Sequence, residues 1–576
     1  MDEQYPIYTA RTECQDCFKC IRHCPVKAIK MREGHAAVLP ELCVACGTCV
    51  EVCPAGAKRV RSDVNRARRL LGGDHPVYAS LAPSWVSEFP GADGRNIIAA
   101  LQRLGFAGVG ETALGAQEVS AAAAEELAGM QGGLLLSSAC PSAVEFVRKY
   151  RPEQTGHITR MLSPALTHAR MLRREFGQEI GVVFIGPCIA KKLEADRHAE
   201  TINLSLTFAE LHEWLELEGI DPETLEAGVE DFVLAPVEEG AVYPVEGGMI
   251  ETIRRNEILS EKAVHFLTVA GVAGMDRMLG RTTGDPANGC PVFVELLSCE
   301  GGCVNGPCAT CGRMSLEANL SVMNRVRLAP GIRRQAGIDL AEEFTPEAVE
   351  AQDYAPEAVA GALRSIGKTQ PEDELNCGGC GYETCRNFAM ALLSGRAEPT
   401  MCLSWLRRNA QRKANALLRC MPSSVVIVDR DLQIIECNQP FAELSGEDTL
   451  SAFEAAPGLN GAALEKIIPF AALFRQVLNT GAEIQRQNYS FGKRLLNITI
   501  FNIDPGQVVG AVIQDVTRFE MRRKQIAQQA REVIDKNMMT VQEIARQLGE
   551  NMADTEILLR SIAEGYGNSQ SGGEEG

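Results

Sequence analysis

The chain has 576 residues, enough for several domains of ordinary size. Its formal net charge of −18 disfavours a surface for nucleic acid or anionic lipid, and its 45% hydrophobic and 23% charged content is ordinary for a globular protein. The sequence contains no apolar run long enough to cross a membrane, and its first residues lack a signal-peptide pattern. We therefore expect a cytoplasmic protein without a membrane span.

The cysteine content is the first feature that needs a chemical explanation. The chain contains 21 cysteines, whereas disulfides are rare in the reducing cytosol. Metal ligation is therefore the better expectation.

Residues 1–62 contain the same cysteine run twice, C-x-x-C-x-x-C-x-x-x-C-P. This is the run of bacterial ferredoxins with two four-iron clusters, in which the fourth cysteine binds the cluster of the other run. The predicted ligand sets are Cys14, Cys17, Cys20 and Cys53 for one cluster, and Cys43, Cys46, Cys49 and Cys24 for the other. Zinc is a weaker alternative, because both runs are complete. We expect this domain to carry electrons.

Residues 75–330 alternate short apolar runs with amphipathic stretches, which predicts α/β layers. Buried strands are expected at 77–83, 132–138, 181–187, 231–236 and 291–298.

Three of these runs lead directly to cysteines. Cys140, Cys188 and Cys299 each follow a predicted strand, and Cys303 lies four residues after Cys299. Taken alone, Cys140 is most simply a buried core residue. Ligands in α/β sheets bind beyond the carboxyl ends of the strands, however, and four thiolates are the ligand set of a four-iron cluster. The shared placement favours a cluster over core packing.

At this point the chain resembles the catalytic domain of FeFe hydrogenases. The resemblance rests on SSACPSA (137–143), GPCIAKKLE (186–194) and LLSCEGGCVNG (296–306), which are similar to the family motifs T-S-C-C-P-x-W, M-P-C-x-x-K-x-x-E and M-A-C-x-x-G-C-x-x-G. The resemblance implies an H-cluster. Its four-iron cubane would be held by Cys140, Cys188, Cys299 and Cys303, and Cys303 would also bridge to a di-iron unit that carries CO and cyanide. Lys191 would contact an iron-bound cyanide; a solvated surface lysine is the alternative.

The departures from the family pattern concern proton transfer and packing. Ala139 stands where the family has its proton-shuttle cysteine, and Ala121–Ala124 stand where the family places acidic residues. Gly186 and Leu297 replace two methionines that pack the di-iron site. Because alanine carries no proton and positioned relays contribute ~10²–10⁴-fold to rates, we expect slow turnover.

The remaining cysteines of this region have no place in the motifs. Cys308 and Cys311 could form another thiol relay, hold a metal or be structural, and Cys290 is expected to be structural.

A further cysteine set follows an acidic, Pro-containing linker at 331–372. Residues 373–414 carry Cys377, Cys380, Cys385 and Cys402 and resemble a small Fe–S domain of redox proteins, which implies a further four-iron cluster. Zinc is the alternative here, since this spacing does not decide the metal.

The last part of the chain changes in character. Residues 415–518 resemble a PAS sensor domain, ending in Asp515-Val516-Thr517. Residues 519–565 then predict a signalling helix, whose apolar residues between 534 and 562 alternate at steps of four and three, as in a coiled coil. A homodimer, a coil with another protein, or packing on the PAS domain would each use this stripe. Residues 566–576 are expected to be a disordered tail.

This domain order favours a sensor. We expect a sensory FeFe hydrogenase that binds or slowly oxidises H₂, passes electrons through Fe–S clusters to the PAS domain and coil, and is read by a kinase or phosphatase. The alternatives are a slow hydrogenase linked to ferredoxin or another electron carrier, and an Fe–S redox protein without the di-iron unit.

Overall fold

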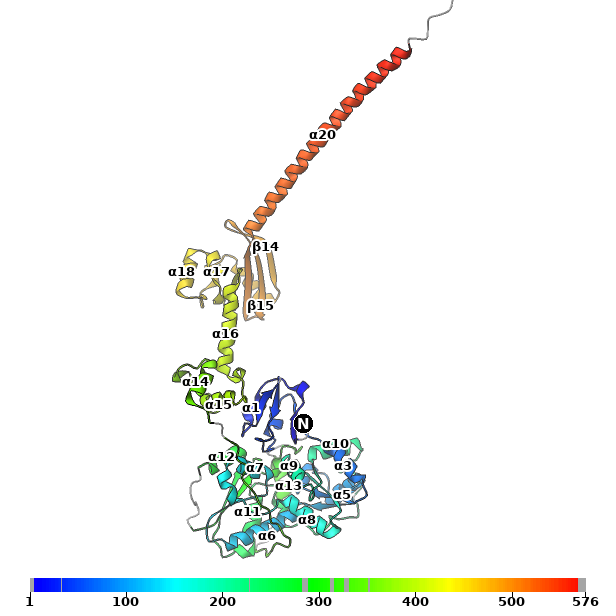
Figure 1. The fold of residues 1–576 in the computed structure, drawn as a ribbon, viewed down its shortest axis with the longest axis vertical. Coiled ribbons are helices and arrows are strands. Elements are labelled where there is room, and N and C mark those ends of the chain that lie inside the picture. Colours follow the sequence, from blue (N-terminus) through cyan, green and yellow to red (C-terminus); the bar gives the residue numbers. More distant parts are fainter. Residues whose placement is uncertain are drawn as a thin grey trace, which may run out of the picture. The chain divides into compact units, whose positions relative to one another are not determined.

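The computed structural model describes residues 5–32, 34–226, 228–281, 289–310, 315–325, 331–350 and 353–567. The chain divides into two compact units, residues 1–406 and 407–576, shown in Figure 1. Among the helices of the described ranges, none is long and apolar enough to cross a membrane.

The N-terminal domain is built from two short two-stranded sheets and two short helices. Strands β1 (Ile7–Thr9) and β4 (Lys58–Val60) pair antiparallel, as do β2 (Ile29–Arg32) and β3 (His35–Val38). Helices α1 (Lys19–His23) and α2 (Thr48–Glu51) each contain the third cysteine of one run, Cys20 and Cys49. Helix α3 (Val64–Leu71) leads into the next domain.

The central domain contains a four-stranded parallel sheet in the order β6-β5-β8-β9. The strands are β5 (Val77–Leu81), β6 (Gly108–Glu111), β8 (Gly181–Gly186) and β9 (Leu204–Thr207). All six residues of β8 are buried, as expected for a strand covered on both faces. The helices around this sheet are α4 (Trp85–Glu88), α5 (Gly94–Arg103), α8 (Pro164–Phe176), α9 (Ala190–Arg197) and α10 (Phe208–Leu217).

A second parallel sheet in the same domain has the order β10-β11-β7. Its strands are β7 (Leu134–Leu136), β10 (His265–Ala270) and β11 (Val292–Leu297). Its surrounding helices are α6 (Ala113–Gly129), α7 (Pro141–Tyr150), α11 (Gly248–Arg254), α12 (Val272–Leu279) and α13 (Leu316–Met323).

The α/β layers predicted for this region are present, but one expected strand is wrong. Residues 231–236 form no strand. The Val233 amide donates one hydrogen bond to the Val109 carbonyl of β6, 2.9 Å away. An apolar run predicts burial but not the repeated backbone pairing that makes a strand.

The last part of the first unit is helical. Helix α14 (Pro356–Ser365) packs against α15 (Cys385–Leu393), so the second half of the expected linker is folded onto the cysteine-containing segment. Helix α16 (Leu403–Cys420) begins directly after Cys402.

The second unit contains a five-stranded antiparallel sheet in the order β13-β12-β16-β15-β14. Its elements are β12 (Ser424–Asp429), β13 (Ile434–Cys437), α17 (Gln439–Ser445), α18 (Glu447–Ala455), α19 (Ala471–Thr480), β14 (Ile484–Phe491), β15 (Arg494–Asp504) and β16 (Val508–Asp515). The helices cover one face of this sheet, where Phe441, Phe474 and Ile498 are buried together.

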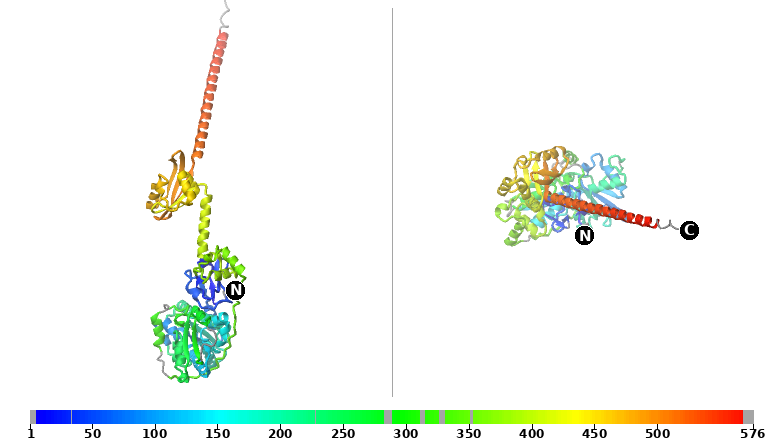
Figure 2. Two further views of the ribbon diagram at one scale, coloured as in Figure 1. Left: turned by 90° about the vertical axis from the view of Figure 1, so that its left-hand side faces the viewer. Right: turned by 90° about the horizontal axis from the view of Figure 1, so that it is seen from above.

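Helix α20 (Thr517–Gly567) leaves this domain and is not packed on it, as both Figure 1 and Figure 2 show. Its start is fixed by the Asp515 carboxylate, which accepts hydrogen bonds from the amide and hydroxyl of Thr517. Every residue from 521 to 564 is exposed.

Candidate metal centre

Four cysteines predicted from the sequence lie together in the central domain. Cys140 follows β7, Cys188 follows β8, and Cys299 and Cys303 follow β11. All four line one small, enclosed cavity. Because β7 and β11 belong to one sheet and β8 to the other, the cavity lies where the carboxyl ends of both parallel sheets meet.

Glycine makes the Cys303 turn possible. Gly302 has φ +95°, and a Cβ there would lie 2.3 Å from the Pro244 carbonyl oxygen. Any side chain at this position would therefore clash with the backbone, and the following residue could not turn toward the cavity. This explains the Gly-Gly that precedes Cys303.

The electrostatics of the cavity favour a bound cation. Burial, with Cys140 next, raises the pKa of Cys188 to about 11. Burial and the neighbouring cysteines also raise the pKa of Cys299 and of Cys303. Thiolates are the metal-binding form, so Cys188, Cys299 and Cys303 need positive charge beside them to ionise.

The spacing of these side chains suits a cluster better than a single ion. Within the described ranges, no three His, Cys, Asp or Glu side chains are close enough together to hold one metal ion. In a four-iron cubane each cysteine binds a different iron, so its ligands stand further apart. Four free thiols, buried or half-buried around one cavity, fit that group.

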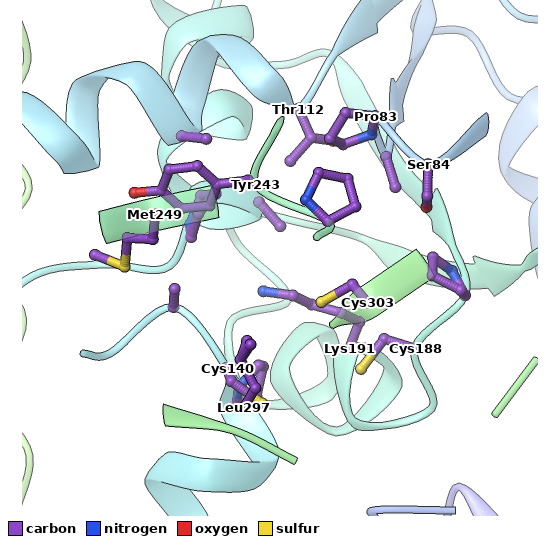
Figure 3. A pocket seen from close by; sticks show the side chains of 18 of the residues that line it. Pro83, Ser84, Thr112, Cys140, Cys188, Lys191, Tyr243, Met249, Leu297 and Cys303 are labelled. Carbon is purple, nitrogen blue, oxygen red and sulfur yellow. The ribbon is translucent and has the colours of Figure 1, made fainter. Parts of the chain in front are cut away.

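A second cavity of about 90 Å³ adjoins the first. Cys140, Cys188 and Cys303 line both cavities, so they form the shared wall. The walls of the larger cavity are mostly apolar, and Figure 3 shows Lys191 and Cys303 inside it.

Lys191 is held in this cavity by α9 and α8. Its Nζ donates to the Ser163 hydroxyl at 2.8 Å and forms an ion pair with Glu194 at 2.7 Å. The lysine is only 9% exposed, so the alternative of a solvated surface lysine is wrong. A buried ammonium beside an apolar cavity is a donor for an anionic ligand.

The Ser84 side chain gives a second sign that a polar group belongs in this cavity. Ser84 lines it, is 2% exposed, and its hydroxyl has no hydrogen-bond partner among the residues that the structure describes. An unpaired buried hydroxyl is costly, and a cyanide or carbonyl ligand could pair with it. The donors present therefore fit a di-iron unit with such ligands.

The departures from the family pattern have visible consequences. Ala139 lines the larger cavity and puts no proton-carrying group into it. Gly186 leaves no free space: a Cβ there would lie 2.8 Å from the Phe184 ring, which itself lines the cavity. Phe184 thus fills the space that a side chain at 186 would need. Leu297 lines both cavities.

Glu295 and Tyr243 also line the larger cavity and, like Ser84, were not predicted from the sequence. Burial raises the pKa of Glu295, on β11, to about 7, although the Met249 amide and the Thr268 hydroxyl donate to its carboxylate. The Tyr243 hydroxyl lies 2.9 Å from that of Ser120. In the sequence, Glu295 could have been noticed as a charged residue inside a predicted apolar strand, whereas no sequence feature indicated Tyr243.

In the N-terminal domain, the structure places cysteines of each predicted ligand set close to one another. Burial raises the pKa of Cys20, Lys58 opposes this, and Cys14, Cys53 and Cys17 add to it. Burial, then Cys46, raises the pKa of Cys24 to about 12, and Cys43 contributes as well. Each fourth cysteine therefore lies among the cysteines of the other run.

The C-terminal set lies around the start of α15 and the start of α16. Burial raises the pKa of Cys380, to which Cys402 and Cys377 contribute. Cys385 is the first residue of α15 and is buried.

The cysteines outside the four sets have different surroundings. Cys308 is buried and its amide donates to the Pro187 carbonyl at 3.1 Å. The Cys290 thiol lies 3.2 Å from the Ala263 carbonyl oxygen, away from both cavities. Cys311 lies outside the described residues.

Comparison with protein families agrees with this geometry. Residues 75–307 match the family described as iron only hydrogenase large subunit, C-terminal domain. The matched residues include all four cysteines of the candidate metal centre. The expected FeFe hydrogenase relationship and multidomain fold are thus confirmed, and the ferredoxin and PAS domains are confirmed as well. Residues 13–57 match a 4Fe-4S dicluster domain, 373–404 an Fe–S cluster family, and 413–481 a PAS domain.

Among curated proteins, the chain is similar to an NADP-reducing hydrogenase subunit, HndD, of Solidesulfovibrio fructosivorans. The two are 26% identical over 362 residues, which is 51% of this chain and 61% of the relative. The cytosolic Fe-S cluster assembly factor NAR1 of Botryotinia fuckeliana is 23% identical over 221 residues, 34% of this chain and 38% of that protein. The chain thus spans less than two thirds of either relative.

Among solved structures, a variant of the FeFe hydrogenase HydA1 of Chlamydomonas reinhardtii aligns over 50% of this chain and 100% of its own, with 16% identity and a TM-score of 0.38. A HydA(ΔEFG) structure, from a study of stepwise H-cluster assembly, gives 16% identity and a TM-score of 0.40 with the same coverage.

Proposed function

We propose that the chain is a sensory FeFe hydrogenase. H₂ binds or is slowly oxidised at an H-cluster held by Cys140, Cys188, Cys299 and Cys303. The resulting electrons pass through the Fe–S clusters, and the PAS domain and α20 convert the redox change into a signal.

One observation carries this proposal: the cavity keeps the means to hold an H-cluster but lacks the shuttle group. Lys191 and Ser84 offer donors to anionic ligands, whereas Ala139 stands beside Cys140. An enzyme selected for fast turnover needs a positioned proton relay. A sensor needs only that H₂ binds one of two protein conformations better than the other.

Lys191, Glu295 and the apolar walls of the cavity have different tasks in this scheme. When bound, the di-iron unit supplies the metal on which H₂ is split into two protons and two electrons. Lys191 would donate from Nζ to a cyanide of that unit, and Glu194 with Ser163 holds the ammonium in place. The apolar walls exclude water. Glu295 can hold a proton on its carboxyl group near neutral pH.

The output part of the proposal rests on chain order. The C-terminal cysteine set ends at Cys402, directly before α16, and α16 leads to the PAS sheet. We propose H₂ as the signal, ferredoxin or another electron carrier as redox partner, and a kinase or phosphatase as the protein that reads α20. The proposed location is the cytoplasm.

Infrared spectroscopy of anaerobically matured protein tests the proposal. CO and cyanide bands that are present under N₂ and shift under H₂ are expected. Absence of these bands, with iron sufficient for four cubanes, would overturn it. Lys191→Met is the matched variant, because it removes the ammonium but no cysteine.

Further measurements distinguish two other candidate functions from the sensor. The first relative is named as a hydrogenase subunit, which favours the alternative of a slow, carrier-linked hydrogenase, and continuous H₂-dependent reduction of an added electron carrier would support it. The assembly-factor relative favours a protein with a cubane alone. The buried position of Lys191 argues against the second, because a cubane alone needs no cyanide donor.

A further inference from the structure

The Fe–S segment at 373–404 packs directly on the N-terminal ferredoxin domain. Gly381 lies so close to α1 that a Cβ there would stand 2.5 Å from the Arg22 Cα. Tyr382 is 8% exposed and belongs to the same hydrophobic cluster as Cys24 and Cys385. Figure 1 shows α15 beside α1 accordingly.

Lys27 lies in this contact. Its Nζ stands 5.6 Å from the centre of the Tyr382 ring and donates to the Arg22 carbonyl at 2.9 Å. The Lys27 amide donates to the Cys24 carbonyl at 3.3 Å, and Tyr382, over whose ring Nζ lies, is two residues after Cys380. The ammonium is therefore within electrostatic reach of one cysteine from each of two predicted cluster sets.

Tyr382 offers a second polar group at the same place. Its hydroxyl is buried and, among the described residues, has no hydrogen-bond partner. A thiolate or sulfide of a bound cluster is an acceptor that would pair with this hydroxyl.

The Cys24 set also reaches the candidate metal centre. Cys46, which belongs to this set, lines the small cavity together with Cys299. Gly47, with φ +85°, lets the chain approach Pro307 in the wall of that cavity: a Cβ there would lie 2.5 Å from the Pro307 Cβ. The set of Cys24, Cys43, Cys46 and Cys49 therefore has three neighbours, namely the metal centre, the other ferredoxin set and the C-terminal set.

We propose that Lys27 and Tyr382 form an electron junction between the cluster held by Cys24, Cys43, Cys46 and Cys49 and the cluster held by Cys377, Cys380, Cys385 and Cys402. The proposal rests on the cluster assignment of the proposed function. One electron leaves the first cluster, which is oxidised, and enters the second, which is reduced; no bond or proton changes. The first cluster is then a branch point, from which electrons reach either the N-terminal cluster or the C-terminal one.

The C-terminal branch ends beside α16. The Cys402 thiol lies 3.3 Å from the Ser404 hydroxyl, in the first turn of that helix. An added negative charge at a helix N-terminus is stabilising, so reduction of this cluster would strengthen the start of α16. This gives H₂-derived electrons a defined route toward the signalling part of the chain.

Redox titration followed by electron paramagnetic resonance tests the junction in full-length protein that contains its cubanes but no di-iron unit. Lys27→Met should lower the reduction potentials of the two junction clusters, because a positive charge favours the reduced, more negative state. A tenfold weaker reduction equilibrium corresponds to about 59 mV for a one-electron couple. Tyr382→Phe should lower the same two potentials less, and Lys27→Arg should keep them.

The controls lie in the same domain. Lys30→Met on β2 and Tyr8→Phe on β1 remove the same groups away from the junction, and all potentials should stay unchanged. Unchanged potentials in Lys27→Met, a shift confined to the Cys14 set, or zinc in the C-terminal site would each overturn the junction. Because the titration needs no H₂, its result is independent of the infrared test. Missing infrared bands together with a shifted Lys27→Met potential would reject the sensor but keep the junction.

Discussion

Two adjacent lysines of α9 have different tasks, although the sequence presents them as one pair. Lys191 points to the larger cavity, whereas Lys192 is fully buried and forms ion pairs with Asp63 at 2.9 Å and Glu210 at 2.8 Å. Asp63 lies in the segment that joins the ferredoxin domain to the central domain. Lys192 therefore ties the two domains together, and Lys191 remains available for a ligand.

Replacing each lysine by methionine should separate these tasks. We expect Lys191→Met to lose or shift the cyanide infrared bands and to lower the melting temperature less than Lys192→Met, because Lys191 forms an ion pair, among the described residues, with Glu194 alone. Lys192→Met leaves the buried Glu210 carboxylate without its cation, while Asp63 keeps its ion pairs with Arg61 and Arg66, and we expect a cost of about 3–5 kcal/mol of stability. Infrared spectra and thermal unfolding of both variants check this. Equal loss of stability in the two variants would show that Lys191 is structural too.

Glu295 predicts a pH dependence of stability. Burial raises its pKa from 4.5 to about 7, so between these values the folded protein holds a proton that the unfolded chain has released. Its contribution to stability is therefore complete below pH 4.5 and falls by roughly 3 kcal/mol as the pH rises through 7. Glu295→Gln keeps an acceptor oxygen but does not ionise.

The melting temperature of Glu295→Gln, relative to the parent protein, should accordingly be higher at pH 8 than at pH 5. Thermal unfolding at these two pH values measures the difference. Glu246, whose charge also raises the pKa of Glu295, provides the control: Glu246→Gln should reduce the effect without removing it. A parent–variant difference that does not depend on pH would contradict the assignment.

At the level of single elements, the sequence predicted the position of the metal centre best where a cysteine directly follows an apolar run. The runs before Cys140, Cys188 and Cys299 predicted strand ends, and the structure brings these ends together. The sequence could not show that β8 lies in a different sheet from β7 and β11, because apolar runs carry no pairing information. Nor could it show that Phe184 fills the space beside Gly186, since that contact depends on side-chain direction in the folded state.

Helix α6 determines how much a restored thiol can achieve. Thr112, just before it, and Ala116 line the larger cavity, while Ala121, Ala123 and Ala124 further along the helix are buried and apolar. Ala139→Cys returns the shuttle group but not the rest of the route. We expect H₂ turnover to rise less than tenfold, well short of the ~10²–10⁴-fold typical of a positioned relay.

Ala116→Cys is the matched control for this experiment, because it places a thiol in the same cavity away from Cys140. It should leave H₂ turnover unchanged. A hundredfold rise in Ala139→Cys would mean that a complete proton route survives elsewhere in the domain, and the sensor proposal would then lose its main support.

At the scale of the whole molecule, α20 is the element whose sequence pattern and exposure disagree most. Its apolar residues at steps of four and three, among them Met538, Val541 and Leu548, predict a buried stripe, yet they are 58%, 63% and 58% exposed. An isolated helix of 51 residues, about 76 Å long, does not keep such a stripe in water without a partner. The PAS domain does not cover it, so packing on that domain is not the explanation.

A second copy of the chain is the partner that we expect. Two identical stripes are complementary when the helices run parallel and in register. In such a coil the e and g positions of the heptad lie beside the a/d stripe and face the partner helix. Between residues 535 and 558, the charged residues at these positions are Asp535 and Glu556 alone, so the two copies would meet without rows of like charge. The stripe begins at Ile534, because Lys524 and Arg531 occupy the equivalent positions before it.

Light scattering of the full-length protein should therefore give the mass of a dimer. Met538→Lys combined with Leu548→Lys puts charge into the stripe and should give the monomer mass. Met539→Lys combined with Ile557→Lys changes exposed apolar residues outside the stripe and should leave the dimer intact. A monomeric parent protein would instead assign the stripe to a different protein, and a dimer that survives the first pair would place the contact between copies outside α20.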